Sequence, residues 1–233
     1  MTGPRPVRIK ICCIQDQEEL ALAVRYGASA IGLVSAMPSG PGPIPEPVIA
    51  RLARAVPPGV AAFLLTSARD PAAIADQVRR LGPQVVQIVD RPEAGCWAAL
   101  RGAAPAVKIV QVIHVTGPEA LPAALAAAEH VDALLLDSGN PTAAVRELGG
   151  TGRTHDWTVS RSVARGVAVP VWLAGGLTPG NVAAAIEAVR PFGVDVCSGV
   201  RTNGKLDEAK LARFVAGVAA AGAAADHSRR PGP

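Results

Sequence analysis

The stretch VPVWLAGGLTPGNVAAAIEAVRPFGVDVCSGV, residues 169–200, holds two short aliphatic runs separated by a helix-like segment. The runs at 169–174 and 193–198 are almost continuously apolar, which is typical of strands buried on both faces of a parallel sheet. Thr178 followed by Pro179 is the pattern of a capping residue before a proline at the first helical position. The stretch therefore predicts a strand–helix–strand unit.

The same alternation runs through the chain. Further strand-like runs lie at 7–14, 29–34, 60–65, 84–89, 107–113 and 132–137. Helix starts are indicated by Asp16 with Glu19 three residues later and by Asp70 before Pro71, and residues 204–218 form an amphipathic closing segment. Residues 139–157 (GNPTAAVRELGGTGRTHDW) read mostly as a long loop, and long loops in compact domains are often functional.

Eight strands alternating with helices predict an α/β fold with one (β/α)8 TIM barrel over residues 7–222. A doubly wound open sheet fits less well, because no Gly-x-Gly-x-x-Gly turn follows the first strand. Residues 223–233 are small, polar and proline-ended, and we expect a flexible C-terminal tail there.

Composition narrows the class of partner. The net charge is +4, and no basic run interleaved with aromatics indicates nucleic-acid binding. No apolar run approaches the roughly 18 residues of a membrane span, and the N-terminus has no signal-peptide core. The cysteines lack metal-ligand spacing. These features predict a cytoplasmic protein with reduced thiols, monomeric or homodimeric, without a metal, that acts on a small molecule.

Barrel chemistry takes place at the carboxyl ends of the strands. Gly175 and Gly176 end one strand, and Ser198 and Gly199 end the next, which matches the phosphate site that barrels often build after their last two strands. Asp137 ends an apolar strand and is a candidate catalytic acid, or a cap of the following loop. His114 and His155 are weaker candidates for contact with a ligand.

Cys12 and Cys13 stand together at the end of the first strand. Cys12 could serve as a base if its pKa is lowered, or could simply be a small buried hydrophobe. Lys10 shares the parity of Cys12 and could pair with a carboxylate inside the barrel. Cys13, with opposite parity, is expected to point the other way.

The motifs KICCI, LLLDS, GGTGRTHDW, LAGGLTPGNV and PFGVDVCSGV, in this order and spacing, resemble the phosphoribosylanthranilate isomerase family of tryptophan biosynthesis. The resemblance spans about residues 7–218 and implies a barrel that needs no cofactor. It implies that Cys12 is the catalytic base and Asp137 the general acid. Gly175, Gly176, Ser198 and Gly199 then bind the substrate phosphate, and Cys13 replaces a family glycine.

The resemblance implies an Amadori rearrangement of N-(5-phosphoribosyl)anthranilate. Asp137 would protonate the furanose oxygen so that the ring opens, and Cys12 would remove the C2′ proton. Alternatives are a related isomerase acting on another phosphoribosyl amine, of histidine biosynthesis or specialised metabolism, and a phosphosugar-binding barrel without turnover.

Three positions depart from the family. The loop after the second strand, SAMPSGPGPIPEP at 35–47, has no arginine or lysine where the family usually grips the anthranilate carboxylate. Val89, at the end of the fourth strand, stands where the family often has a histidine. Arg201, after the eighth strand, stands where the family commonly has an acidic residue. We expect the carboxylate clamp to have moved, with His114 or Arg69 as candidates, or the amine to be a different one.

Overall fold

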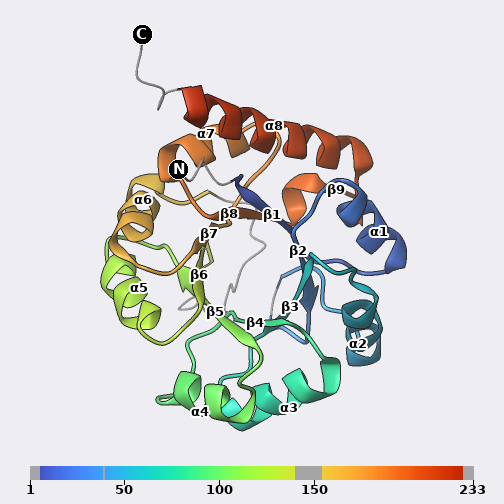
Figure 1. The fold of residues 1–233 in the computed structure, drawn as a ribbon, viewed down its shortest axis with the longest axis vertical. Helices are drawn as coiled ribbons and strands as arrows, with labels where there is room; N and C mark the ends of the chain where they lie inside the picture. Colours follow the sequence, from blue (N-terminus) through green and yellow to red (C-terminus); the bar gives the residue numbers. More distant parts are fainter. Residues whose placement is uncertain (1–5, 39, 140–153, 228–233) are drawn as a thin grey trace.

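The computed structural model describes residues 6–38, 40–139 and 154–227. Its strands close into one parallel barrel in sequence order, and its helices form a ring outside it (Figure 1). The predicted (β/α)8 barrel is confirmed. Each of the predicted strand runs overlaps one of the barrel strands, and β3 and β5 each extend one residue past the predicted end. The strands are β1 Arg8–Ile11, β2 Ala30–Val34, β3 Ala61–Thr66, β4 Val85–Ile88, β5 Lys108–His114, β6 Ala133–Asp137, β7 Val171–Leu173 and β8 Gly193–Val196.

The outer helices follow the strands in turn. They are α1 Gln17–Arg25, α2 Glu46–Ala55, α3 Pro71–Leu81, α4 Cys96–Ala103, α5 Ala120–Ala128, α6 Trp157–Gly166, α7 Val182–Val189 and α8 Glu208–His227. A single 3-10 turn, η1 Ser198–Val200, follows β8, and a two-stranded ribbon of β9 Arg201–Thr202 and β10 Lys205–Leu206 leads into α8.

Two predicted helix starts are confirmed by their caps. The side chain of Asp16 accepts a hydrogen bond from Glu19 N at 2.9 Å, and that of Asp70 accepts one from Ala73 N at 2.8 Å. In each case a carboxylate satisfies an amide at the helix start that has no acceptor within the helix.

The predicted start of α7 at Pro179 is wrong, because this helix begins at Val182. The Asn181 side chain accepts from Thr178 N at 2.8 Å and donates to Gly176 O at 2.9 Å. These two bonds hold residues 176–181 as a turn. The loop after β7 is therefore longer than the Thr178–Pro179 pattern predicts.

The long loop predicted after the sixth strand falls mostly on residues 140–153, which lie outside the described residues. The chain is described again from Thr154, and Asp156 caps α6 by accepting from Thr158 N at 2.8 Å. At the other end of the chain, α8 continues past Gly222 to His227.

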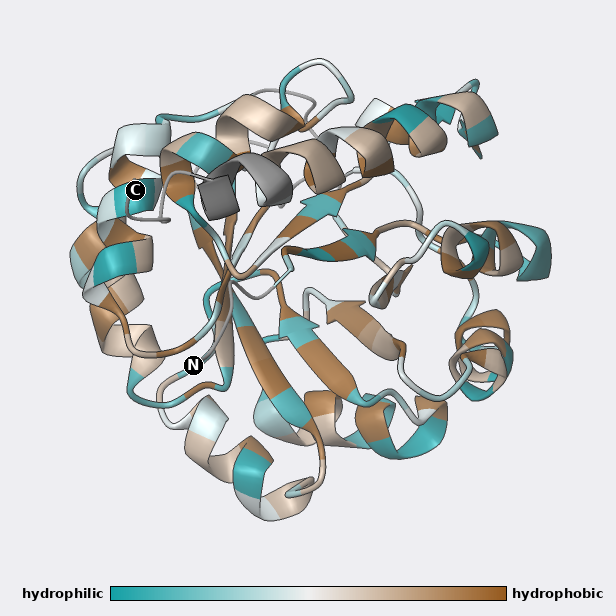
Figure 2. Cartoon of the chain, turned by 45° about the horizontal axis from the view of Figure 1, so that its top comes forward, coloured by the Kyte–Doolittle hydropathy of each residue, from teal (hydrophilic) through white to brown (hydrophobic). Residues whose placement is uncertain are grey.

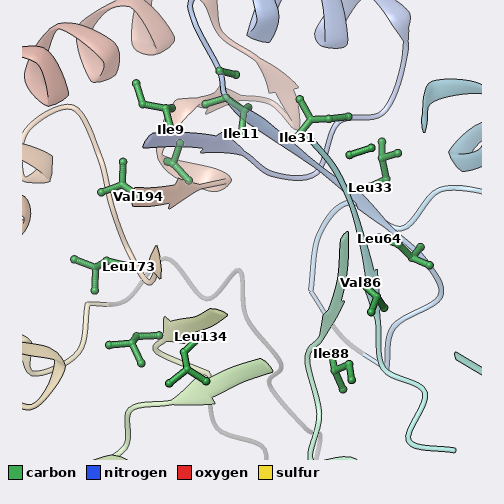
Figure 3. Close-up of a cluster of buried hydrophobic side chains, with 14 of the residues drawn as sticks. Ile9, Ile11, Ile31, Leu33, Leu64, Val86, Ile88, Leu134, Leu173 and Val194 are labelled. Atoms are coloured by element: carbon green, nitrogen blue, oxygen red, sulfur yellow. The ribbon is translucent and has the colours of Figure 1, made fainter. Parts of the chain in front are cut away.

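The core is aliphatic and has two layers. Strand residues of one parity face the helices and form the larger layer, which Figure 3 shows as isoleucine, leucine and valine side chains from several strands. Residues of the other parity fill the barrel, including Phe63, Val112, Leu135 and Trp172. The strands are accordingly mostly apolar in Figure 2, while the helices also carry hydrophilic residues.

Candidate active site

An ion pair between two neighbouring strands lies inside the barrel. Lys10 of β1 is completely buried, and its Nζ lies 2.9 Å from Oδ2 of Asp195 of β8. The two residues are register partners on neighbouring strands. Burial alone would lower the pKa of Lys10, but the charge of Asp195 raises it above its ordinary value. Lys10 therefore stays charged and forms the pair expected inside the barrel.

Cys12 lies directly above this pair. It is buried, and a side chain at Gly32 of β2 would collide with it, since an added Cβ would be 2.7 Å from Cys12 Sγ. The pKa of Cys12 is lowered, chiefly because the Cys13 thiol hydrogen-bonds to its thiolate and also because Lys10 is positive, while burial opposes both. The surroundings therefore favour a thiolate at Cys12.

The predicted orientation of Cys13 is wrong. β1 ends at Ile11, and Cys13 has a φ of 63°, which is left-handed and breaks the alternation of an extended strand. Its side chain joins Cys12 in the cluster inside the barrel and its thiol faces Pro41 O at 3.6 Å. Burial and its bonds to the thiols of Cys12 and Cys197 raise its pKa well above the ordinary value, with the bond to Cys12 the largest cause.

Cys13 also supports the loop after β2. A Cβ at Gly42 would lie only 2.6 Å from the Cys13 Cβ. The loop rejoins the barrel where Ile44 N donates to Val34 O at 3.0 Å. The proline-rich loop therefore packs against the end of β1 next to Cys12.

Asp137 ends β6, and its Oδ1 accepts from Ser138 N at 2.7 Å. Burial raises its pKa and Asp195 adds to the rise, while the Ser138 amide, His114 and Lys10 oppose it. Cys12 and Asp137 thus both feel the charges of Lys10 and Asp195. Their pKa values move in opposite directions, Cys12 toward the thiolate and Asp137 toward the carboxylic acid. This is the arrangement expected of a base and an acid at one site.

The two glycine turns after β7 and β8 meet at the same rim. Gly175 and Gly176 have φ values of 81° and 62°, and both are half-buried. A Cβ at Gly199 would lie 1.9 Å from Leu177 O, so the turns touch backbone to backbone. Among the described residues, no hydrogen bond uses the N–H of Gly175 or Gly176 as donor. Such amides can receive an anion.

His155 packs against this turn. A Cβ at Gly175 would lie 2.8 Å from its Nδ1, and its Nε2 is 2.7 Å from Ser160 Oγ. Burial lowers the pKa of His155 to about 4, so the ring is neutral at pH 7. We therefore expect His155 to support the turn rather than supply a positive charge.

His114 is the last residue of β5, and Arg69 lies in the loop between β3 and α3. His114 Nε2 is 2.9 Å from Val89 O, and Arg69 is exposed with its Nε donating to Arg91 O at 2.8 Å. His114 lines a cavity of about 540 Å³ beside α4 and α5, together with Arg91 and Trp97. Arg91 was not predicted from the sequence, although it lies three residues after the end of β4 and carries a charge.

Comparison with known proteins identifies the family. The family model for N-(5'-phosphoribosyl)anthranilate isomerase matches residues 9–217. The chain belongs to this family.

Relatives and solved structures agree. A Halobacterium salinarum isomerase of this name is 39% identical over 90% of this chain and 94% of its own, and one from Thermosynechococcus vestitus is 31% identical over 99% and 96%. A phosphoribosylanthranilate isomerase from Thermotoga maritima superposes with a TM-score of 0.77 at 30% identity, covering 92% of this chain and 99% of that one.

A solved structure of a phosphoribosylanthranilate isomerase holds reduced 1-(o-carboxyphenylamino)-1-deoxyribulose 5-phosphate. It has a TM-score of 0.75 and 28% identity, and covers 92% of this chain and 99% of that one. Among the described residues of the present chain, no group of three or more histidines, cysteines or carboxylates could hold a metal ion, and no helix is long and apolar enough to cross a membrane.

Proposed function

We propose that this protein isomerises N-(5-phosphoribosyl)anthranilate to 1-(2-carboxyphenylamino)-1-deoxyribulose 5-phosphate. Family membership supports the reaction. The observation that carries the assignment to residues is the pair of opposite pKa shifts at Cys12 and Asp137, around the shared Lys10–Asp195 ion pair.

In the proposed reaction, the carboxylic acid of Asp137 donates a proton to the furanose ring oxygen, and the ring opens to an iminium ion. The Cys12 thiolate then removes the proton from C2′ to give an enolamine, which tautomerises to the ketone. The thiolate ends as a thiol and the acid as a carboxylate, so one proton passes back to Asp137 before the next turnover. A positioned acid or base contributes on the order of 10²–10⁴-fold.

The phosphate is proposed to bind at the turns of Gly175–Gly176 and Ser198–Gly199. Their meeting point after β7 and β8 is where barrels frequently bind phosphate. The bound product analogue of the relative carries the same 5-phosphate. For the anthranilate carboxylate, the candidates among the described residues are Arg69, Arg91 and His114, which lie in the loops and strands around the ends of β4 and β5.

The first test is turnover. Purified protein should isomerise the anthranilate substrate, and its gene should restore growth of a tryptophan auxotroph that lacks this isomerase. If the gene does not restore growth and the purified protein does not isomerise the anthranilate compound, the result would favour another phosphoribosyl amine as the substrate.

The second test addresses the residues. Cys12→Ser and Asp137→Asn should each lower kcat by about 10²–10⁴-fold while retaining affinity for a phosphate-bearing product analogue, because each removes one proton-transfer group. Stopped assays would give kcat, and calorimetry with the reduced product analogue would give the affinity. A Cys12→Ser enzyme with near wild-type kcat would remove Cys12 as the base.

A further inference from the structure

Arg201 stands where the family resemblance leads us to expect an acidic residue. It is only 8% exposed, although it begins the short ribbon between β8 and α8. A buried guanidinium needs several acceptors to offset its lost hydration. Two of the acceptors found here lie at the catalytic end of β1.

One end of the guanidinium binds the turn that carries Cys12. Arg201 Nη2 donates to Cys12 O at 3.3 Å and also to Cys13 O. These are the carbonyls on either side of the Cys13 φ of 63°. A non-glycine residue in this left-handed conformation is strained and persists only where its surroundings hold it.

The rest of the guanidinium is fixed by Glu19 of α1 and by the carbonyl of Gly204, to which Nη1 donates at 2.9 Å. Its Nη1 lies 2.8 Å from Glu19 Oε1, and its Nη2 lies 2.9 Å from Glu19 Oε2, a two-pronged pair. Glu19 in turn accepts from Gln15 N and from Leu206 N, each at 3.0 Å. Arg201 is thus held on both sides and cannot move independently of the turn.

We propose that Arg201 is a positioning residue of the isomerase: by binding the carbonyls of Cys12 and Cys13, it holds the left-handed turn that keeps Cys13 beside Cys12. The proposal rests on the proposed function only for the use of Cys12 in turnover. The turn places the thiol and the backbone amide of Cys13 beside Cys12, and both groups lower the pKa of Cys12. The conformation of the turn therefore affects how well a thiolate at Cys12 is stabilised. The other ionisable groups that face Cys12 are Lys10 of β1 and Asp195 of β8, and neither is a partner of Arg201.

Arg201→Lys is the informative variant. Lysine can keep one cation beside Glu19, but it lacks the planar fork that binds a carboxylate and two carbonyls together. We expect kcat at pH 7 to fall about 10- to 100-fold with KM changed by less than about threefold, since a small misplacement of a reacting group costs this much. The ascending limb of the pH profile should move to higher pH.

A second readout does not depend on turnover. The Cys12 thiolate can be titrated by its absorbance near 240 nm, as the difference between each protein and its Cys12→Ser counterpart. The midpoint should rise in Arg201→Lys. If this variant does not fold, Glu19→Gln gives the same test, because it loosens the anchor of the guanidinium and should raise the midpoint by a smaller amount.

The matched control is Arg25→Lys. Arg25 is another arginine paired with a glutamate: its Nη2 lies 3.1 Å from Glu208 of α8, but this pair is exposed and does not contact the turn. It should change neither the midpoint nor kcat. An Arg201→Lys protein with lower thermal stability but an unchanged thiolate midpoint and kcat would overturn the proposal. A raised midpoint in a protein whose wild type does not isomerise the substrate would leave the proposal standing and remove the proposed function instead.

Discussion

At the scale of the residue, the thiol of Cys12 is set apart by its neighbours. The two cysteines are chemically identical, yet the pKa of Cys12 is lowered and that of Cys13 is raised. The difference arises because Cys13 lowers the pKa of Cys12, and because the positive charge of Lys10, two residues earlier in the chain, lowers it further. The sequence pattern KICCI identified the pair, but strand parity could not predict that Cys13, two residues past the end of β1, is left-handed.

Cys13→Gly should move the ascending limb of the kcat profile to higher pH. The base works deprotonated, so the rate rises as pH rises through the pKa of Cys12. Removing the Cys13 thiol removes the largest cause that lowers this pKa, so the limb shifts upward, and at high pH the wild-type rate should return. The measurement is kcat from pH 5 to 10. Cys96→Ala, which alters a buried thiol on α4, is the control and should leave the profile unchanged. A profile equally unchanged in Cys13→Gly would contradict this account of Cys12.

At the scale of the element, the site depends on short segments that join the barrel to its helices. The turns after β7 and β8 pack so closely that Gly199 has no room for a side chain. Glycine is needed there because it lets the two backbones approach closely. The sequence indicated both turns by their glycines, although it placed the start of α7 too early.

Gly199→Ala should therefore weaken substrate binding. Its Cβ would lie 1.9 Å from Leu177 O, so the two turns must separate and the proposed phosphate amides lose their alignment. We expect KM to rise about tenfold or more, the loss of roughly one charge-assisted hydrogen bond. Gly180→Ala is the control, because its Cβ would have only an ordinary contact at 3.7 Å in the same loop. Equal KM values for the two variants would argue against phosphate binding at these turns.

The loop after β2 leads to a prediction about the amine. It contains no arginine or lysine and packs against Cys13, so a carboxylate on that side lacks a charged partner from the loop. Each missing charge-assisted hydrogen bond forgoes roughly 1.5–3 kcal/mol. We expect kcat/KM for the anthranilate compound to be only slightly higher than kcat/KM for its aniline analogue, which lacks the carboxylate. A strong preference for the carboxylated compound would show a clamp elsewhere, and Arg69, Arg91 and His114 would be the residues to substitute.

At the scale of the whole molecule, the Lys10–Asp195 pair joins the first strand to the last, where the barrel closes. Its members come from positions 185 residues apart. The pair also lies beneath both proposed catalytic groups, so the closure of the barrel and the electrostatics of the site depend on the same charges.

Lys10→Met should destabilise the protein by about 3–5 kcal/mol, because it leaves Asp195 buried without its counter-charge. Urea denaturation followed by circular dichroism would measure the change. The double variant Lys10→Met/Asp195→Leu should recover most of the loss, since two apolar side chains leave no unpaired charge. Arg25→Met, which breaks the exposed pair with Glu208, should have little effect. A double variant as unstable as the single one would show that the cost comes from packing rather than from charge.

The sequence alone was sufficient to predict the barrel and the family. It also predicted that Cys12, Asp137 and the two glycine turns lie at the ends of strands. These follow from local patterns: apolar runs of strand length, glycines at strand ends, and motifs in a fixed order. The partner of Lys10, the fold of Cys13 into the barrel and the partners of Arg201 were decided only by the tertiary structure. The contacts of Lys10 with Asp195 and of Arg201 with Glu19, Cys12 and Cys13 join residues from opposite ends of the chain, and closure of the barrel brings those ends together. No local pattern encodes such distances, because they depend on the register of every strand between them.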